Sequence, residues 1–170
     1  MTRAIAFVGM GSNLVHPRRQ LARAVRRLAR LPRTRLLALS GNFVTAPLGT
    51  TAAQPDYVNA VAMLATALPP RALLARLMAL ERRQGRPRDA RTPRNAPRSL
   101  DLDLLLYGRL RMRTRALTLP HPRMHERAFV LRPLAAIAPF ATVPGRGAAR
   151  RLIGGTHGQR VAPTRTHHLH

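Results

Sequence analysis

The chain contains no cysteine and no tryptophan, and although it is strongly basic it contains no lysine. Without cysteine, disulfides and thiolate chemistry are excluded, and a cytoplasmic location is the default expectation. No run of 18 apolar residues occurs and the N-terminus has no cleavable signal pattern, so we expect neither a membrane span nor a signal peptide. At 170 residues, 45% of them hydrophobic, the chain is long enough to form one domain with a core.

Acidic residues are scarce: the chain has six, against 30 basic residues that are all arginine, and the net charge is +24. Such a charge favours polyanionic partners, among them RNA, DNA, anionic lipid and nucleotide phosphates. Because the arginines are spread along the chain, we interpret most of them as solvated surface residues. A few are candidates for specific phosphate ligands, since a guanidinium binds phosphate through two N–H groups at once.

Two of the six acids, Asp101 and Asp103, stand two residues apart inside an apolar run. A strand has a period of two, so these carboxylates point to one face while Leu100, Leu102 and Leu104 point to the other. Neighbouring carboxylates repel each other unless cations lie between them, and Mg²⁺ suits this role, usually with phosphates completing its shell. An Asp-x-Asp pair can also be a solvated acidic edge. The residues around the pair are therefore needed to distinguish a metal site from such an edge.

Hydrophobic periodicity and turn residues predict four strands and four helices. The strands are expected over 3–10, 35–45, 56–66 and 99–107, and the helices over about 17–31, 70–84, 123–127 and 129–138. Loops are expected at 46–55 and at 86–97, and we expect the second loop to be mobile because it is rich in proline and arginine.

The chain after residue 143 is rich in glycine, arginine and histidine. It is expected to form at most a short strand pair and then a frayed tail. We therefore predict one domain over residues 1–145 and a basic, partly disordered tail over 146–170.

The predicted element order is β-α-β-β-α-β, without an internal repeat. Each of the first two helices crosses over between strands, which predicts a ferredoxin-like α+β sandwich. In this fold class the helices pack on one face of a mainly antiparallel sheet. The other face, with the loops around it, is then expected to be free for ligands.

Several motifs occur in a fixed order along the chain: GSNL at 11–14, TAPLG at 45–49, QPDYVNA at 54–60, Glu81 followed by GRPR at 85–88, RNAPRSLDLDLL at 94–105 and PHPRMHERAFVL at 120–131. With these motifs the chain resembles the 6-hydroxymethyl-7,8-dihydropterin pyrophosphokinases of folate biosynthesis, over about residues 4–145. The string at 94–105 is the most specific of the six.

The resemblance implies a reaction in which the β,γ-diphosphate of ATP moves to the hydroxymethyl oxygen of the dihydropterin and AMP leaves. It implies two Mg²⁺ ions held by Asp101 and Asp103. It also implies that Arg86, Arg88 and Arg98, which flank the predicted mobile loop, reach the phosphates, and that closure of this loop gates catalysis. Positioning and charge neutralisation are the main demands of such a transfer.

The same resemblance implies two binding regions. On the ATP side it implies Leu104, Thr118, His121 and Arg127. On the pterin side, Tyr57 and Phe129 offer aromatic rings for a flat heterocycle, and Asn59 offers both a donor and an acceptor for its amide-like edge. Backbone groups of Thr45, Pro47 and Leu48 complete that pocket.

Ordinary structural roles are open for some of these residues: Phe129 as core packing and His121 as a structural histidine. We assign Phe7, Phe43 and Phe140 to the core. Three positions depart from the pattern of some family members, which carry Gln at Met78, Arg at Ala116 and Trp at Asn95. Arg115 is adjacent to Ala116 and offers a substitute guanidinium.

Two other functions would fit part of the sequence. RNA-recognition modules share the strand order and suit the charge, but they need aromatic residues on exposed strands in a glycine-and-aromatic signature that 3–10 and 99–107 lack. A different Mg²⁺-dependent nucleotidyl transferase leaves Tyr57, Asn59 and Phe129 unexplained. We expect no specific nucleic acid partner, non-specific nucleic acid binding at low salt, no membrane partner, and a monomer.

Overall fold

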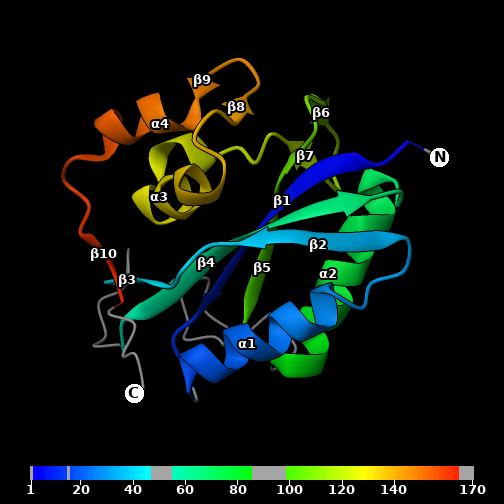
Figure 1. Cartoon of the computed structure of the whole chain (residues 1–170), viewed down its shortest axis with the longest axis horizontal. Helices are drawn as coiled ribbons and strands as arrows, with labels where there is room; N and C mark the ends of the chain where they lie inside the picture. Colours follow the sequence, from blue (N-terminus) through cyan, green and yellow to red (C-terminus); the bar gives the residue numbers. More distant parts are fainter. Residues whose placement is uncertain (1, 15, 47–54, 86–98, 165–170) are drawn as a thin grey trace.

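The computed structural model describes residues 2–14, 16–46, 55–85 and 99–164, and Figure 1 shows the arrangement. Its centre is an antiparallel sheet in which β5, β1 and β4 lie side by side and both β2 and β3 pair with β4. The strands are β1 (Ala4–Ser12), β2 (Thr34–Leu39), β3 (Phe43–Thr45), β4 (Tyr57–Thr66), β5 (Asp101–Tyr107) and β10 (Val161–Pro163). The order β5-β1-β4-β2, with a helix after β1 and another after β4, confirms the ferredoxin-like fold.

Two helices cover one face of this sheet, α1 (Pro17–Leu28) and α2 (Pro70–Gln84) (Figure 1). Both begin with a proline, which suits the first helical turn because that turn has no partner for its N–H groups. Their fully buried leucines, among them Leu28 and Leu77, join sheet residues such as Val8 in the larger core cluster. None of the helices in the described part of the chain is both long and apolar enough to cross a membrane.

The opposite face of the sheet is also partly covered, and here the sequence-based expectation of a free face is wrong. Helix α3 (Ala128–Ile137) packs on it, with α4 (Ala149–Leu152) beside α3, as Figure 1 shows above the sheet. Leu131 and Leu134 of α3 meet Phe7 and Val61 in a second core cluster. The remaining part of this face, toward the C-terminal end of β1, is where the candidate site lies.

The predicted strand over 35–45 is two strands, β2 and β3, because the chain leaves the ladder at residues 40–42. At this break Ser40 keeps contact with β4: its Oγ accepts the Val61 N–H at 2.9 Å, and its own N–H donates to the Val61 carbonyl at 2.9 Å. The short helix predicted near 123–127 is the 3₁₀ helix η1 (Met124–Glu126).

The C-terminal region has more regular structure than the sequence predicts. The expected strand pair is β8 (Thr142–Val143) with β9 (Gly147–Ala148), but α4, the 3₁₀ helix η2 (Ile153–Thr156) and β10 follow it. A polar sequence gives no periodicity for such short elements, whereas the pairing of β10 with β3 is made by backbone groups. The domain boundary at 145 stays a prediction. A second short pair, β6 (Met112–Arg113) with β7 (Thr118–Leu119), follows β5.

Two of the phenylalanines assigned to the core lie elsewhere than expected. Phe7 is buried, but Phe43 is only half-buried and Phe140 is 75% exposed. The Arg150 guanidinium carbon lies 5.1 Å from the centroid of the Phe140 ring. This ring therefore packs under a cation at the surface.

Candidate active site

The carboxylate pair of β5 lies on the sheet face opposite α1 and α2. Asp101 and Asp103 are half-buried and pair with Gly11 and Gly9 of β1, while Leu102 is buried in the core under the helices. The alternation predicted from the sequence is therefore confirmed. Two carboxylates on one face form an oxygen donor set that suits Mg²⁺.

Glycines form the floor of the sheet beside the carboxylates. A Cβ atom at Gly11 would lie 2.9 Å from the Asn59 Oδ1, and one at Gly9 would lie 3.4 Å from Leu105. A side chain at Gly11 would therefore displace the buried Asn59 amide. With no side chains at Gly9 and Gly11, only backbone lies between the acids of β5 and the polar residues of β4.

Glu81 of α2 holds the strand that carries the acids. Its Oε1 accepts the Leu102 N–H at 2.7 Å, and this N–H lies between Asp101 and Asp103 in sequence. In the described part of the chain β5 is an edge strand whose one neighbour in the sheet is β1, so an outward N–H needs a partner outside the sheet. Glu81 therefore ties α2 to the strand segment between the two acids.

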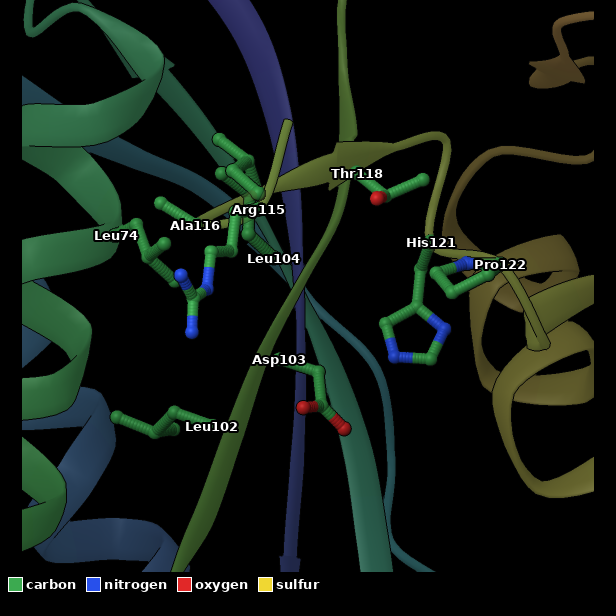
Figure 2. Close-up of a pocket in the computed structure, with 10 residues that line it drawn as sticks. Leu74, Leu102, Asp103, Leu104, Arg115, Ala116, Thr118, His121 and Pro122 are labelled. Atoms are coloured by element: carbon green, nitrogen blue, oxygen red, sulfur yellow. The ribbon is translucent and has the colours of Figure 1, made fainter. Parts of the chain in front are cut away.

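A cleft of about 250 Å³ opens beside Asp103. Figure 2 shows the Asp103 carboxylate and the His121 ring near each other, with the Arg115 guanidinium beside Leu74 of α2. The lining residues are Leu74, Leu102, Asp103, Leu104, Arg115, Ala116, Leu117, Thr118, His121 and Pro122. The structure thus brings together four predicted residues of the ATP and metal sites: Asp103, Leu104, Thr118 and His121. Arg115 lines the same cleft, and its role as a substitute for an arginine at Ala116 stays a prediction.

His121 follows a cis peptide bond between Leu119 and Pro120. The Arg123 N–H donates to its Nδ1 at 3.2 Å, which assigns the proton of the neutral ring to Nε2. Burial lowers the pKa of His121, Asp103 opposes this shift, and the charges of Arg127 and Arg123 add to it. His121 is therefore a neutral hydrogen-bond donor at pH 7.

Arg127 stands at the start of α3, near both acids. Burial lowers the pKa of its guanidinium, while the charges of Asp103 and, less strongly, Asp101 act in the opposite direction. It remains a cation at neutral pH. Its guanidinium carbon also lies 5.5 Å from the centroid of the Phe129 ring, so one residue connects the acidic region with an aromatic one.

The predicted pterin residues meet around Thr45. Asn59 is 6% exposed, and its Nδ2 donates to the Thr45 Oγ1 at 2.9 Å, while Tyr57 pairs directly with Thr45 across β3 and β4. Thr45 and Phe129 line a second cavity of about 240 Å³. Phe129 is half-buried: it packs against the second core cluster and also lines this cavity, so both the core role and the pterin role predicted for it stay open.

Five predicted residues lie outside the described part of the chain: Arg86, Arg88, Arg98, Pro47 and Leu48. Their roles stay predictions. Among the described residues, no group of three or more His, Cys, Asp or Glu side chains is placed to hold a metal ion.

Sequence reasoning missed one polar contact at this site. The Gln159 side chain, in the predicted tail, accepts the Ala128 N–H and donates to the Glu126 carbonyl. Nothing in the glycine- and arginine-rich sequence around it indicates such a contact.

An acid pair on a ferredoxin-like sheet, with Asp103 lining an open cleft together with His121 and Arg115, is typical of an enzyme that handles phosphate groups. The family model for 7,8-dihydro-6-hydroxymethylpterin-pyrophosphokinase (HPPK) matches residues 7–139. The chain belongs to this family, and it is a pyrophosphokinase of folate biosynthesis.

Curated relatives carry the same name, 2-amino-4-hydroxy-6-hydroxymethyldihydropteridine pyrophosphokinase. The protein from Pseudomonas aeruginosa is 48% identical over 138 residues, which are 81% of this chain and 83% of the relative. The protein from Haemophilus influenzae is 41% identical over 148 residues, which are 87% of this chain and 90% of the relative.

Solved structures support the fold. An HPPK-DHPS protein crystallised in complex with substrates superposes with a TM-score of 0.69 at 12% identity, over 91% of this chain and 43% of that one. The wild-type HPPK-DHPS of Plasmodium falciparum with pteroate gives a TM-score of 0.68 at 10% identity, over 89% of this chain and 44% of that one. This chain therefore spans less than half of those longer proteins, and the likeness concerns the fold alone.

Proposed function

We propose that the protein transfers the β,γ-diphosphate of ATP to the hydroxymethyl group of 6-hydroxymethyl-7,8-dihydropterin and releases AMP. In this reaction the hydroxymethyl oxygen forms a bond to the β-phosphorus, the bond from that phosphorus to the oxygen of AMP breaks, and the hydroxyl proton is lost. The observation that carries the proposal is the shared sheet face: Asp101 and Asp103 pair with Gly11 and Gly9, and Gly11 in turn pairs with Asn59.

The carboxylates are proposed to hold two Mg²⁺ ions, and their hard oxygen donors on one open face support this. When bound, Mg²⁺ neutralises charge on the transferred phosphates. Asp101 and Asp103 are held for this role by the Glu81 contact with the strand between them. Their half-buried position keeps them open to a ligand on the side away from the leucine core.

The cleft beside Asp103 is proposed to hold the phosphates of ATP. His121 is suited to donate from Nε2 to a phosphate oxygen, because its Nδ1 already accepts the Arg123 N–H. Arg127 adds a fixed positive charge, and partial burial strengthens its effect on developing negative charge. Arg115, Thr118 and the Leu104 strand segment line the same cleft. Arg86, Arg88 and Arg98 are proposed to reach the phosphates as well.

The region around Thr45 is proposed to hold the dihydropterin. Asn59 keeps its Oδ1 directed toward the bare backbone at Gly11, because its Nδ2 is engaged by Thr45. Tyr57 and Phe129 supply aromatic rings for stacking, and Pro47 and Leu48 are proposed to complete the pocket.

The alternative of an RNA-recognition module is disfavoured by an observation on the fold. Those modules stack bases on aromatic residues of an exposed sheet face, whereas α3 packs against Phe7 and Val61 on the corresponding face here. The cytoplasmic location and the monomeric state stay predictions.

The test is an AMP-release assay with ATP, Mg²⁺ and 6-hydroxymethyl-7,8-dihydropterin. We expect pterin-dependent AMP from the wild type, and a loss of about 1000-fold or more in Asp101→Asn/Asp103→Asn. Asp56→Asn, an exposed acid outside the cleft, is the matched control and should keep wild-type turnover. Pterin-independent AMP release, or normal turnover in the double variant, would refute the proposal.

A further inference from the structure

Gln159 lies between η2 and β10, beyond the residues that the family model matches. Its side chain bridges two backbone groups of another segment: Oε1 accepts the Ala128 N–H at 2.9 Å and Nε2 donates to the Glu126 carbonyl at 2.6 Å. These two groups stand on either side of Arg127. The carboxamide therefore fixes the backbone of the residue between η1 and α3.

The start of α3 depends on this contact. Ala128 is the first residue of the helix. The residue before it, Arg127, provides no side-chain cap, and the first turn contains no acidic residue. An N–H group at this position has no partner within the helix. Gln159 supplies the missing acceptor from a distant part of the chain, as a capping side chain would.

A second anchor holds the same C-terminal segment against the pterin side. Strand β10 pairs with β3 in a register that sets Val161 opposite Thr45, and the Thr164 N–H donates to the Asn42 carbonyl at 2.9 Å. Between the two anchors, residues 158–161 form one wall of the cavity that Thr45 and Phe129 also line. The wall therefore belongs to the same cavity as two of the predicted pterin residues.

We propose that Gln159 is a positioning residue for dihydropterin binding: by bridging Glu126 and Ala128 it fixes the start of α3 and hence the place of Phe129 in the cavity. The proposal rests on the proposed function. It makes the segment after residue 145 part of the site rather than a tail.

The test measures the dissociation constant of 6-hydroxymethyl-7,8-dihydropterin, with Mg²⁺ and a non-hydrolysable ATP analogue present. We expect Gln159→Ala to weaken pterin binding about tenfold, because two hydrogen bonds at the cavity wall are lost. Gln159→Glu keeps the acceptor for Ala128 but loses the donor to Glu126, so its affinity should lie between those of the wild type and the alanine variant. In steady-state assays the KM for pterin should rise more than kcat falls.

His157→Ala is the matched control, because it changes an exposed side chain two residues away in the same segment. Its affinity for pterin should stay within about twofold of the wild type. Faster amide hydrogen exchange at Ala128 in Gln159→Ala would report the lost bridge independently of activity, whereas Gln159→Glu, which keeps the acceptor, should retain the protection of this amide. This measurement, with Gln159→Glu, keeps the test decisive if Gln159→Ala folds poorly.

Wild-type pterin affinity in Gln159→Ala, or an equal loss in His157→Ala, would overturn the role of Gln159 while leaving the proposed function intact. If the wild type itself does not bind the pterin, the proposed function fails and the positioning role fails with it. The wild-type measurement therefore distinguishes the two failures.

Discussion

The two faces of the central sheet are built from alternate residues of the same strands. One face packs in the core under α1 and α2, and the other carries the candidate site. In β1, Val8 and Met10 enter the leucine core under α1 and α2, whereas Gly9 and Gly11 face the candidate site. In β5 the core face holds Leu102 and the site face holds Asp103. One face supplies apolar burial under α1 and α2, whereas the other packs apolar side chains only under α3 and, at Gly9 and Gly11, lacks side chains and so leaves room for ligands. Stability and chemistry should therefore be separable by single substitutions.

After the acid pair, the largest effect on chemistry alone is expected at the start of α3. Arg127→Ala removes a partly buried cation beside both acids, and kcat should fall about 100- to 1000-fold. Arg132→Ala, an exposed arginine of the same helix, should keep the wild-type rate in the same AMP-release assay. A loss of less than threefold in Arg127→Ala would show that this cation does not act on the phosphates.

The converse experiment changes the core face. Leu77 of α2 is fully buried, and Leu77→Ala should lower the free energy of unfolding by about 2–5 kcal/mol in urea denaturation. Turnover per folded molecule should stay within about twofold of the wild type. Arg76→Ala, the exposed preceding residue, should change stability by about 0.5 kcal/mol or less. A large loss of turnover in folded Leu77→Ala would break the separation between the two faces.

A methyl group at Gly11 tests the floor of the site. Gly11→Ala would push against the buried Asn59 amide at 2.9 Å, and pterin affinity should fall about tenfold because the hydrogen bond to Thr45 is disturbed. Gly41→Ala is the control, because a Cβ there meets nothing within 4 Å. Equal pterin affinities for the two variants, measured by the same binding titration, would argue that Asn59 lies outside the pterin pocket.

The separation between the faces also explains what sequence could predict. Alternation in β5 and helical spacing in α2 are periodic, so the fold class, the core leucines and the common face of Asp101 and Asp103 were predictable. The break at Ser40 was not, because it depends on one hydroxyl bonding to a neighbouring strand. The role of Gln159 was equally hidden, because it joins positions 31 residues apart in sequence through backbone groups that have no sequence signature.

The placement of α3 on the second face was missed for a related reason. Its helical spacing was recognised, but spacing does not say which surface a helix covers when both sheet faces carry apolar residues such as Phe7 and Val8. The cleft residues Thr118 and His121 are predictable from the family resemblance rather than from periodicity. The positions of the loop arginines stay untested.

The smallest predicted effect concerns pH. Burial lowers the pKa of His121, so the unfolded chain binds a proton at the ordinary pKa, about 6.5, before the folded protein does. The stability associated with the neutral ring is thus fully present above that value and is lost as pH falls toward the lowered folded pKa. In urea denaturation at pH 7.5 and 5.5, His121→Asn should lose less stability on acidification than the wild type.

His157 is exposed and serves as the control. Between pH 7.5 and 5.5, the His157→Asn variant should lose as much stability as the wild type. If His121→Asn shows the same change between the two pH values as the wild type, the ring is not desolvated in the folded protein.

The central claim is that the face of β5 that carries Asp101 and Asp103 binds the metal and the phosphates together. The most direct test is calorimetric titration of the folded wild type and of Asp101→Asn/Asp103→Asn with a non-hydrolysable ATP analogue, with and without Mg²⁺. We predict that Mg²⁺ strengthens binding to the wild type by about tenfold or more and leaves the double variant unchanged. The same strengthening by Mg²⁺ in both proteins would contradict the assignment of this face as the metal site.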